Sequence, residues 1–455
     1  MRRYLVPLFV LPVSLGAQTL PPVASVARVA DSLAAAFIAE RSAPSVAIAV
    51  VRGRDTVVMR AWGKADIEQD LAATPRSVYR IGSMTKQFTS SAIMQLVEQG
   101  KVKLDQSIGT YLPTLPVAWR GVTVRQLLNH TSGIPSYTDL GPAWQRRWGE
   151  EMTPDTLVAL TANVPMAFAP GTQWRYDNSG YVVLGMLIEK ITGHSWATDI
   201  AERFTRPLGL EDTRDCPTTP IIPRRVRGYE STGNGWVNAA YLAMSQPYSA
   251  GAMCSTVGDI AKWNRALHTG HVVSPASYTM MTTPEGAAAN SSYGFGLAQD
   301  TAAGRLMIVH GGGINGFASG NAWVPSAELS ITVLANASSA RSDDLVKQLA
   351  RAALGAPLEQ PLQVVPLAAG DRQRFVGVYT LALPNGPRDL TVAVQGDQLT
   401  AQLTGQGPIQ LLYLGDNTFG VGFDRNLRLI FTIQGERATK VTLVQGGGRF
   451  EGPRK

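Results

Sequence analysis

Ser83, Met84, Thr85 and Lys86 place a hydroxyl and an amine three residues apart at the start of a predicted helix. Apolar residues follow at helical spacing, and Gly100 stands where the helix should end. Because residues three apart lie on one helix face, the Lys86 amine would lie beside the Ser83 hydroxyl. A buried lysine can act as the base that a serine nucleophile requires. The pattern predicts nucleophilic catalysis, and by itself it also fits an ordinary helix start with a solvated lysine.

A second motif combines a phenol with a carboxamide. Tyr176 and Asn178 stand on either side of Asp177, in a predicted loop before a helical run over residues 181–191. A tyrosine hydroxyl can donate or accept a hydrogen bond, and an asparagine amide can pair with a peptide group. Asp177 is expected to cap the helix or to face solvent rather than to take part in chemistry.

The third motif places an imidazole before a run of glycines. His310 follows an apolar strand predicted over residues 305–309, and Gly311, Gly312 and Gly313 come directly after it. Successive glycines allow another backbone to approach closely. The first two motifs each arise readily by chance in a chain of this composition, but all three in this order do not.

Together the motifs resemble those of the serine β-lactamase and penicillin-binding superfamily, in the branch of class C β-lactamases and D-alanyl-D-alanine carboxypeptidases. This branch includes related esterases and D-aminopeptidases. The resemblance covers residues 26–354, and supporting segments stand at 127–133, 207–210 and 293–296. It implies a two-lobed hydrolase of α+β or α/β class, in which a helical lobe packs on an antiparallel sheet flanked by helices. The active site would lie in the cleft between the lobes.

The resemblance also implies a role for each motif position. Ser83 would be the acylated nucleophile, and Lys86 and Tyr176 would share the acid and base work. The backbone N–H groups of Ser83 and Gly313 would form the oxyanion hole, which is usually the largest electrostatic contribution to catalysis. Asn178 would bind the substrate amide. The implied substrate-binding and oxyanion group comprises Asn178, His310, Gly311, Gly312 and Gly313.

His310 departs from the lactamase pattern, because the third motif of efficient class C enzymes begins with lysine. Imidazole has an unperturbed pKa of about 6.5, so His310 is expected to be partly charged at neutral pH and to hold a substrate carboxylate weakly. This favours a peptidase or esterase. A class C-type β-lactamase is the alternative, and a slowly acylated penicillin-binding sensor without turnover is an alternative of another class. No metal or other cofactor is expected.

The surrounding pattern suggests how these residues are positioned. Helical spacing predicts helices early and late in the chain, alternation predicts strands beside them, and the stretch 83–270 is mostly helical. We expect the early and late strands to share one sheet that the two helices cover. The predicted helices are 26–39 and 344–354, and the predicted strands are 45–51, 55–62, 305–309, 317–323 and 329–334.

The chain is expected to contain two domains after a leader. Residues 1–17 have the charged, apolar and small-residue order of a secretory signal, which predicts a periplasmic or secreted protein. A membrane anchor is less favoured, because it would need roughly 20 apolar residues and this run is shorter. The hydrolase domain is expected over residues 22–356, a proline-containing linker over 357–370, and a small all-β antiparallel, barrel-like domain over 371–455.

Composition limits the possible partners. The chain has 455 residues, 45% of them hydrophobic, with a net charge of +7. Lys and Arg are scattered, which argues against nucleic-acid binding. We expect a small-molecule or peptide substrate, no nucleic acid and no integral membrane span, and the oligomeric state stays open. Cys216 and Cys254 could form a disulfide or remain two buried thiols.

Overall fold

The computed structural model describes residues 20–232, 235–360, 362–383, 386–404, 407–422, 427–445 and 448–455. The chain divides into two compact units, Met1–Leu358 and Glu359–Lys455. The secretory signal predicted at residues 1–17 lies outside the described residues. Within the described ranges, no helix has the length and apolar character needed to cross a membrane.

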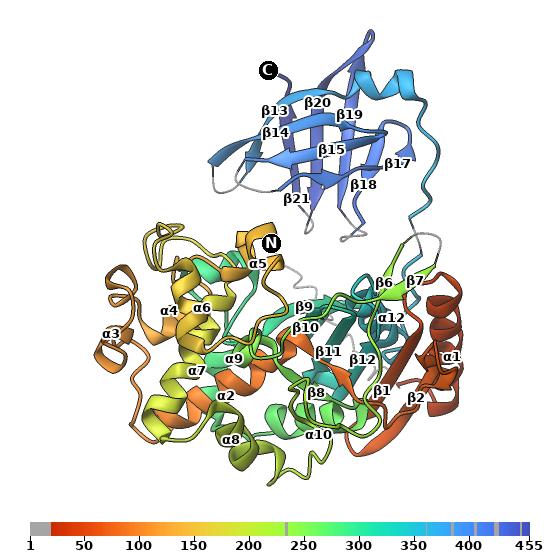
Figure 1. Ribbon diagram of the computed structural model, residues 1–455. Coiled ribbons are helices and arrows are strands. Elements are labelled where there is room, and N and C mark those ends of the chain that lie inside the picture. The colour runs from red at the N-terminus through yellow and green to blue at the C-terminus, as the bar shows by residue number, and fades with distance from the viewer. Residues whose placement is uncertain are drawn as a thin grey trace, which may run out of the picture. The chain divides into compact units, whose positions relative to one another are not determined.

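A seven-stranded antiparallel sheet forms the centre of the first unit, in the order β3-β2-β1-β12-β11-β10-β9 (Figure 1). β1 pairs with β12, so that Val46 lies opposite Ala335. The prediction that early and late strands share one sheet is therefore confirmed. The strands are β1 (Ser45–Arg52), β2 (Asp55–Asp66), β3 (Leu71–Ala72), β9 (Ala298–Ala302), β10 (Arg305–Ile314), β11 (Phe317–Val324) and β12 (Leu329–Ala335).

Helices cover both faces of this sheet. Successive residues of a strand point to opposite faces. Ile48 of β1 joins an apolar core with α1 (Val23–Ala39) and α12 (Ser342–Ala353). Ala47 joins a second core, which contains α10 (Val257–His268) and the helical lobe. Because both faces are covered, β12 is buried along its whole length.

The helical lobe surrounds α2 (Thr85–Glu98), whose residues 85–94 are all buried. Its other helices are α3 (Ile108–Tyr111), α4 (Val124–Leu128), α5 (Pro142–Gln145), α6 (Pro154–Thr161), α7 (Asn178–Thr192), α8 (Trp196–Ile200), α9 (Tyr248–Gly251) and α11 (Pro275–Thr282). Short strands that the sequence did not reveal lie just before and within the expected helical stretch. They are β4 (Tyr79–Arg80), β5 (Arg214–Asp215), β6 (Tyr229–Ser231), β7 (Trp236–Asn238) and β8 (Met253–Ser255).

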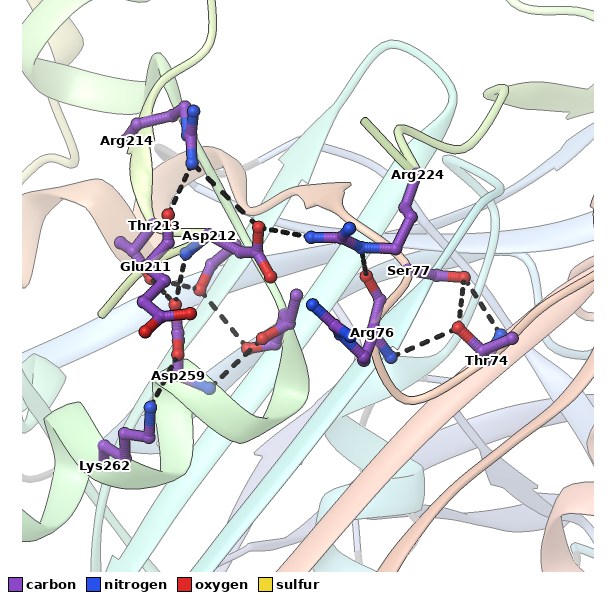
Figure 2. A network of polar contacts seen from close by, with 12 residues as sticks. Thr74, Arg76, Ser77, Glu211, Asp212, Thr213, Arg214, Arg224, Asp259 and Lys262 are labelled. Carbon is purple, nitrogen blue, oxygen red and sulfur yellow. Dashed lines mark hydrogen bonds and ion pairs between the residues drawn. The ribbon is translucent and has the colours of Figure 1, made fainter. Parts of the chain in front are cut away.

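A small sheet has the order β4-β8-β5, and its strand β4 comes just before Ser83 in the chain. A polar network next to β5 ties this sheet to α10 (Figure 2). The Asp259 carboxylate accepts hydrogen bonds from the Asp212 backbone N–H at 2.8 Å and from the Thr213 hydroxyl at 3.2 Å. Arg224 binds the Asp212 carboxylate at 2.7 Å. The network thus holds β5, which pairs with β8, against α10.

Cys254 lies in β8 of the same small sheet, and Cys216 directly follows β5. Both thiols are free and buried in the structure. They are close enough for the Cys254 thiol to lower the pKa of Cys216 by hydrogen bonding. Of the two possibilities that the sequence left open, the structure has the pair of buried thiols.

The second unit is an all-β antiparallel domain, as predicted. Its sheets have the orders β13-β14-β15-β16 and β17-β18-β19-β20-β21. A bridge between Tyr379 and Arg454 joins the edges at β13 and β21, which gives a barrel-like closure. The strands are β13 (Gly377–Leu383), β14 (Gly386–Gln395), β15 (Gln398–Leu403), β16 (Ile409–Gln410), β17 (Leu412–Gly415), β18 (Thr418–Gly420), β19 (Arg428–Gln434), β20 (Arg437–Gln445) and β21 (Gly448–Pro453).

Candidate active site

Ser83 lies in a tight 3-10 turn, Gly82–Met84, which leads into α2. The turn is held from two sides. The Thr85 hydroxyl donates to the Gly82 carbonyl at 2.7 Å and accepts from the Met253 N–H of β8 at 3.2 Å. Gly82 has a φ of +50°, which a glycine adopts without strain. The helix therefore follows a tight turn that leaves its serine half-buried.

Lys86 is fully buried, and its amine is surrounded by three acceptors. Nζ lies 3.2 Å from Ser83 Oγ, 2.8 Å from Asn178 Oδ1 and 2.8 Å from the Ala250 carbonyl oxygen. Burial lowers its pKa to about 7, although the Asp177 carboxylate opposes this shift. As a neutral amine, Lys86 keeps its two N–H bonds to Asn178 and Ala250 and turns its lone pair toward Ser83. The first motif thus has the geometry of a nucleophile beside its base.

The Tyr176 hydroxyl is buried and has no hydrogen-bond partner among the described residues. Burial raises the pKa of Tyr176 strongly, and the neighbouring Ser83 hydroxyl opposes the shift in part. The Lys86 amine lies 4.7 Å from the centre of the tyrosine ring. Tyr176 is consequently a neutral phenol whose proton is not committed to another protein group.

Asn178 is the first residue of α7, and both ends of its side-chain amide contact protein groups. Oδ1 accepts from Lys86, and Nδ2 donates to the Thr138 hydroxyl at 3.2 Å. Its expected bond to a substrate amide would have to use the remaining N–H. Asp177 caps α7 by accepting from the Gly180 N–H at 3.0 Å. The capping prediction is confirmed, but Asp177 is buried rather than solvated, and burial raises its pKa to about 7.

His310 is neutral, and the expectation that it is partly charged is wrong. Its side chain is 7% exposed. Burial, together with the charge of Lys86, lowers its pKa to about 4. Nδ1 lies 2.6 Å from the Gly311 carbonyl, and Nε2 lies 2.8 Å from the Tyr293 hydroxyl. Since a carbonyl only accepts, Nδ1 carries the proton and Nε2 accepts from Tyr293.

The sequence predicted a strand that ends at residue 309, before the glycine run. In the structure the glycine run belongs to β10, which continues to Ile314. Gly312 runs so close to the nucleophile turn that a Cβ there would lie 2.0 Å from the Ile81 carbonyl oxygen. The Ser319 hydroxyl of β11 donates to the same oxygen at 2.8 Å. Only glycine allows this contact, which sets the distance between β10 and Ser83.

Two hollows meet at Ser83 and Gly313. One encloses about 250 Å³ and is bordered by Thr138, Trp144 and Asn178. The other encloses about 430 Å³ and contains Tyr176, His310 and the glycine strand. The structure thus brings every predicted site residue except Lys86 to the wall of a cavity, with Lys86 directly behind Ser83.

Sequence reasoning missed several groups that complete this site. The Ala250 carbonyl holds Lys86, and no side chain could have signalled it. Tyr293 fixes the tautomer of His310 and belongs to the segment 293–296 that supports the resemblance. Thr138 and Trp144 border the smaller hollow from a short 3-10 turn and from α5, elements too short to show a pattern in the sequence.

The family model described as Beta-lactamase matches residues 30–356 of this chain. The match covers the sheet, the helical lobe and all three motifs. The chain therefore belongs to the Beta-lactamase family.

Similar proteins include a D-aminopeptidase, a D-stereospecific amidohydrolase and a penicillin-binding protein homologue. A D-aminopeptidase of Brucella ovis is 28% identical over 324 residues, which is 70% of this chain and 61% of that protein. A D-stereospecific amidohydrolase from Streptomyces sp. has a TM-score of 0.62 at 30% identity, covering 72% of this chain and 97% of its own. The octameric penicillin-binding protein homologue from Pyrococcus abyssi has a TM-score of 0.66 at 25% identity, covering 93% and 99%. The chain spans about 60% of the length of the first curated relatives that it matches.

Proposed function

We propose that this chain is a secreted or periplasmic serine hydrolase that transfers an acyl group through an acyl-Ser83 intermediate. The observation that carries the proposal is the 3.2 Å contact between Lys86 Nζ and Ser83 Oγ. At a pKa of about 7, the buried amine is half deprotonated at neutral pH. A base is most effective when its pKa lies near the operating pH.

The reaction would begin with transfer of the Ser83 proton to neutral Lys86, while Oγ attacks the carbonyl carbon of the substrate. The negative charge that forms on the carbonyl oxygen would be held by the backbone N–H groups of Ser83 and Gly313. As the bond to the leaving amine or alcohol breaks, the Tyr176 hydroxyl would supply a proton to it and recover one from Lys86. Water would then attack the acyl-serine, with proton transfers in the opposite direction.

The preferred substrate is a peptide amide or ester rather than a β-lactam. A lactam or a carboxypeptidase substrate carries a carboxylate near its reacting carbonyl. His310, with a pKa of about 4, offers no positive charge to hold that group. The names of the D-aminopeptidase and the D-stereospecific amidohydrolase support an amide of a D-amino acid.

A substrate panel would test this proposal: D- and L-alanine p-nitroanilide, p-nitrophenyl acetate and a chromogenic cephalosporin. Ser83→Ala should abolish turnover of every substrate that the parent cleaves, and mass spectrometry should find the acyl group only on Ser83. Ser91→Ala is the matched control, since Ser91 is buried on the same helix and its hydroxyl has no partner among the described residues.

Three outcomes would contradict parts of the proposal. Turnover that persists in Ser83→Ala would exclude the acyl-serine mechanism. Acylation of Ser83 without release of the acyl group on any substrate would instead favour the slowly acylated sensor. Cephalosporin turnover that exceeds that of both anilides and the ester would overturn the substrate preference.

Export would be tested by amino-terminal sequencing of protein recovered from the periplasm or the medium, where cleavage after about residue 17 is expected.

A further inference from the structure

A third cavity, separate from the two hollows at Ser83, encloses about 460 Å³ beside β4 and the turn between β10 and β11. Its wall carries three guanidinium groups. The wall includes Arg80, Arg225, Arg227, Tyr241, Asn315 and Phe317. None of the three catalytic side chains borders it.

The positive charges of this cavity are unequally compensated. Arg227 is paired with Glu68 at 2.8 Å and with Asp66 at 3.5 Å. Arg225 donates only to main-chain oxygens, those of Pro217 at 3.0 Å and Thr218 at 3.4 Å. Neutral carbonyls satisfy hydrogen bonds but leave the charge in place. Arg225 therefore keeps a net positive charge that no carboxylate of the described residues balances.

Arg80 has still less compensation. Its guanidinium lies over the Phe317 ring, 5.7 Å from the ring centre, and donates no side-chain hydrogen bond to any residue that the structure describes. Burial lowers its pKa, the Arg225 charge lowers it further, and the groups that raise it are Cys216, Cys254 and Tyr241. No carboxylate is among them. Arginine does not lose its proton in proteins, so Arg80 remains charged.

Two neighbouring guanidinium groups without a counter-ion form an unusual arrangement, because an uncompensated buried charge lowers stability. A carboxylate or phosphate group would relieve it, since guanidinium offers paired N–H donors that match two oxygens. The Tyr241 hydroxyl, 3.0 Å from that of Thr218, adds a neutral donor at the same wall.

We propose that this cavity is an anion-binding site, in which Arg80 and Arg225 together bind a carboxylate or phosphate group of a small molecule. Asn315 borders both this cavity and the hollow that contains Ser83. The anion can therefore be the acidic end of an extended substrate or a free small molecule. The first case rests on the proposed hydrolase function, whereas the binding site itself does not.

Arg224 provides a matched control because it is the chain neighbour of Arg225, but its charge is balanced by a carboxylate. It is paired with the Asp212 carboxylate at 2.7 Å (Figure 2). Arg224 does not border the cavity. Arg224→Gln removes the same charge from the chain without changing the cavity wall.

Binding of inorganic phosphate and of succinate would be measured by calorimetry on the full chain, in the presence of chloride at constant ionic strength. We expect saturable binding by the parent and by Arg224→Gln. Arg80→Gln and Arg225→Gln should each weaken binding at least tenfold, with unfolding temperatures close to that of the parent. Arg225→Lys, which keeps the charge but loses the paired donors, should lie between.

The absence of binding by the parent, or equal binding by all variants, would overturn the proposal. Ser83→Ala should bind both anions like the parent, so that a failed hydrolase proposal would not affect this result. The source of the anion follows from kinetics on paired amide substrates with and without a distal carboxylate. If Arg225→Gln raises KM only for the acidic substrate, with kcat retained, the anion belongs to the substrate. If KM is unchanged for both while phosphate or succinate binding is lost, the site binds a free molecule.

Discussion

Arg80 and Lys86 lie on either side of the Ser83 turn, and the protein treats their charges in opposite ways. Lys86 is fully buried among three acceptors, and burial lowers its pKa to about 7. Arg80 is half-buried over an aromatic ring and has no acceptor among the described side chains or carbonyls. A lysine can relieve the desolvation of its charge by losing a proton, and an arginine cannot. The first is therefore suited to act as a base, and the second is suited to bind an anion.

The largest effect is expected when the base is removed. Lys86→Met should lower kcat/KM by roughly 10² to 10⁴, because general base catalysis contributes about that factor. The measurement is steady-state hydrolysis of the best substrate, with unfolding temperature as a check on folding. Lys86→Arg should not restore activity, since an arginine at this position stays protonated. An active Lys86→Arg variant would show that charge, rather than proton transfer, is what Lys86 provides.

The next effect is the pH dependence of kcat/KM. Below a pH of about 7, Lys86 is protonated and cannot accept the Ser83 proton, so kcat/KM should fall tenfold per pH unit on the acidic side. Above that pH the amine is neutral and the rate should reach a plateau. Asp177→Asn should move this acidic limb to lower pH without removing it, because the Asp177 carboxylate raises the pKa of Lys86. If the limb vanishes in Asp177→Asn, Asp177 itself is the titrating group.

The smallest effect concerns stability at Arg80. Arg80→Met removes an uncompensated charge and keeps an apolar contact with Phe317, so the unfolding temperature should be unchanged or rise by about 2 °C. Calorimetry in an anion-poor buffer would measure this change. A fall of more than about 4 °C would show that the guanidinium has a stabilising role within the protein, which would remove the contrast with Lys86.

Much of the site was predictable because its chemistry resides in side chains. The three motifs stand on separate segments, with Ser83 and Lys86 on the first, Tyr176 and Asn178 on the second and His310 on the third. The prediction failed where main-chain atoms act. The Ala250 carbonyl that holds Lys86 is available on any residue, so no residue type reveals it.

The charge of His310 was beyond prediction for a different reason. Its pKa depends on how deeply the imidazole is buried and on the position of Lys86, and both are set by contacts between segments far apart in the chain. The sequence shows only the residue type, which supports the unperturbed value.

The large sheet and the long helices were predicted well, because their periodic patterns extend over many residues. The strands of the small sheet beside Ser83 have two or three residues each, such as β4 (Tyr79–Arg80). Alternation cannot be detected over so short a run.

The contact between Gly312 and the Ile81 carbonyl limits how this protein can acquire new substrates. Because main chain meets main chain there, any side chain at Gly312 displaces the nucleophile turn before it can alter selectivity. Side chains that reach the smaller hollow, such as Thr138, Trp144 and Leu242, can vary without this displacement. A mutant library built on those three positions would sample specificity, whereas one built on Gly312 would sample mainly inactive proteins.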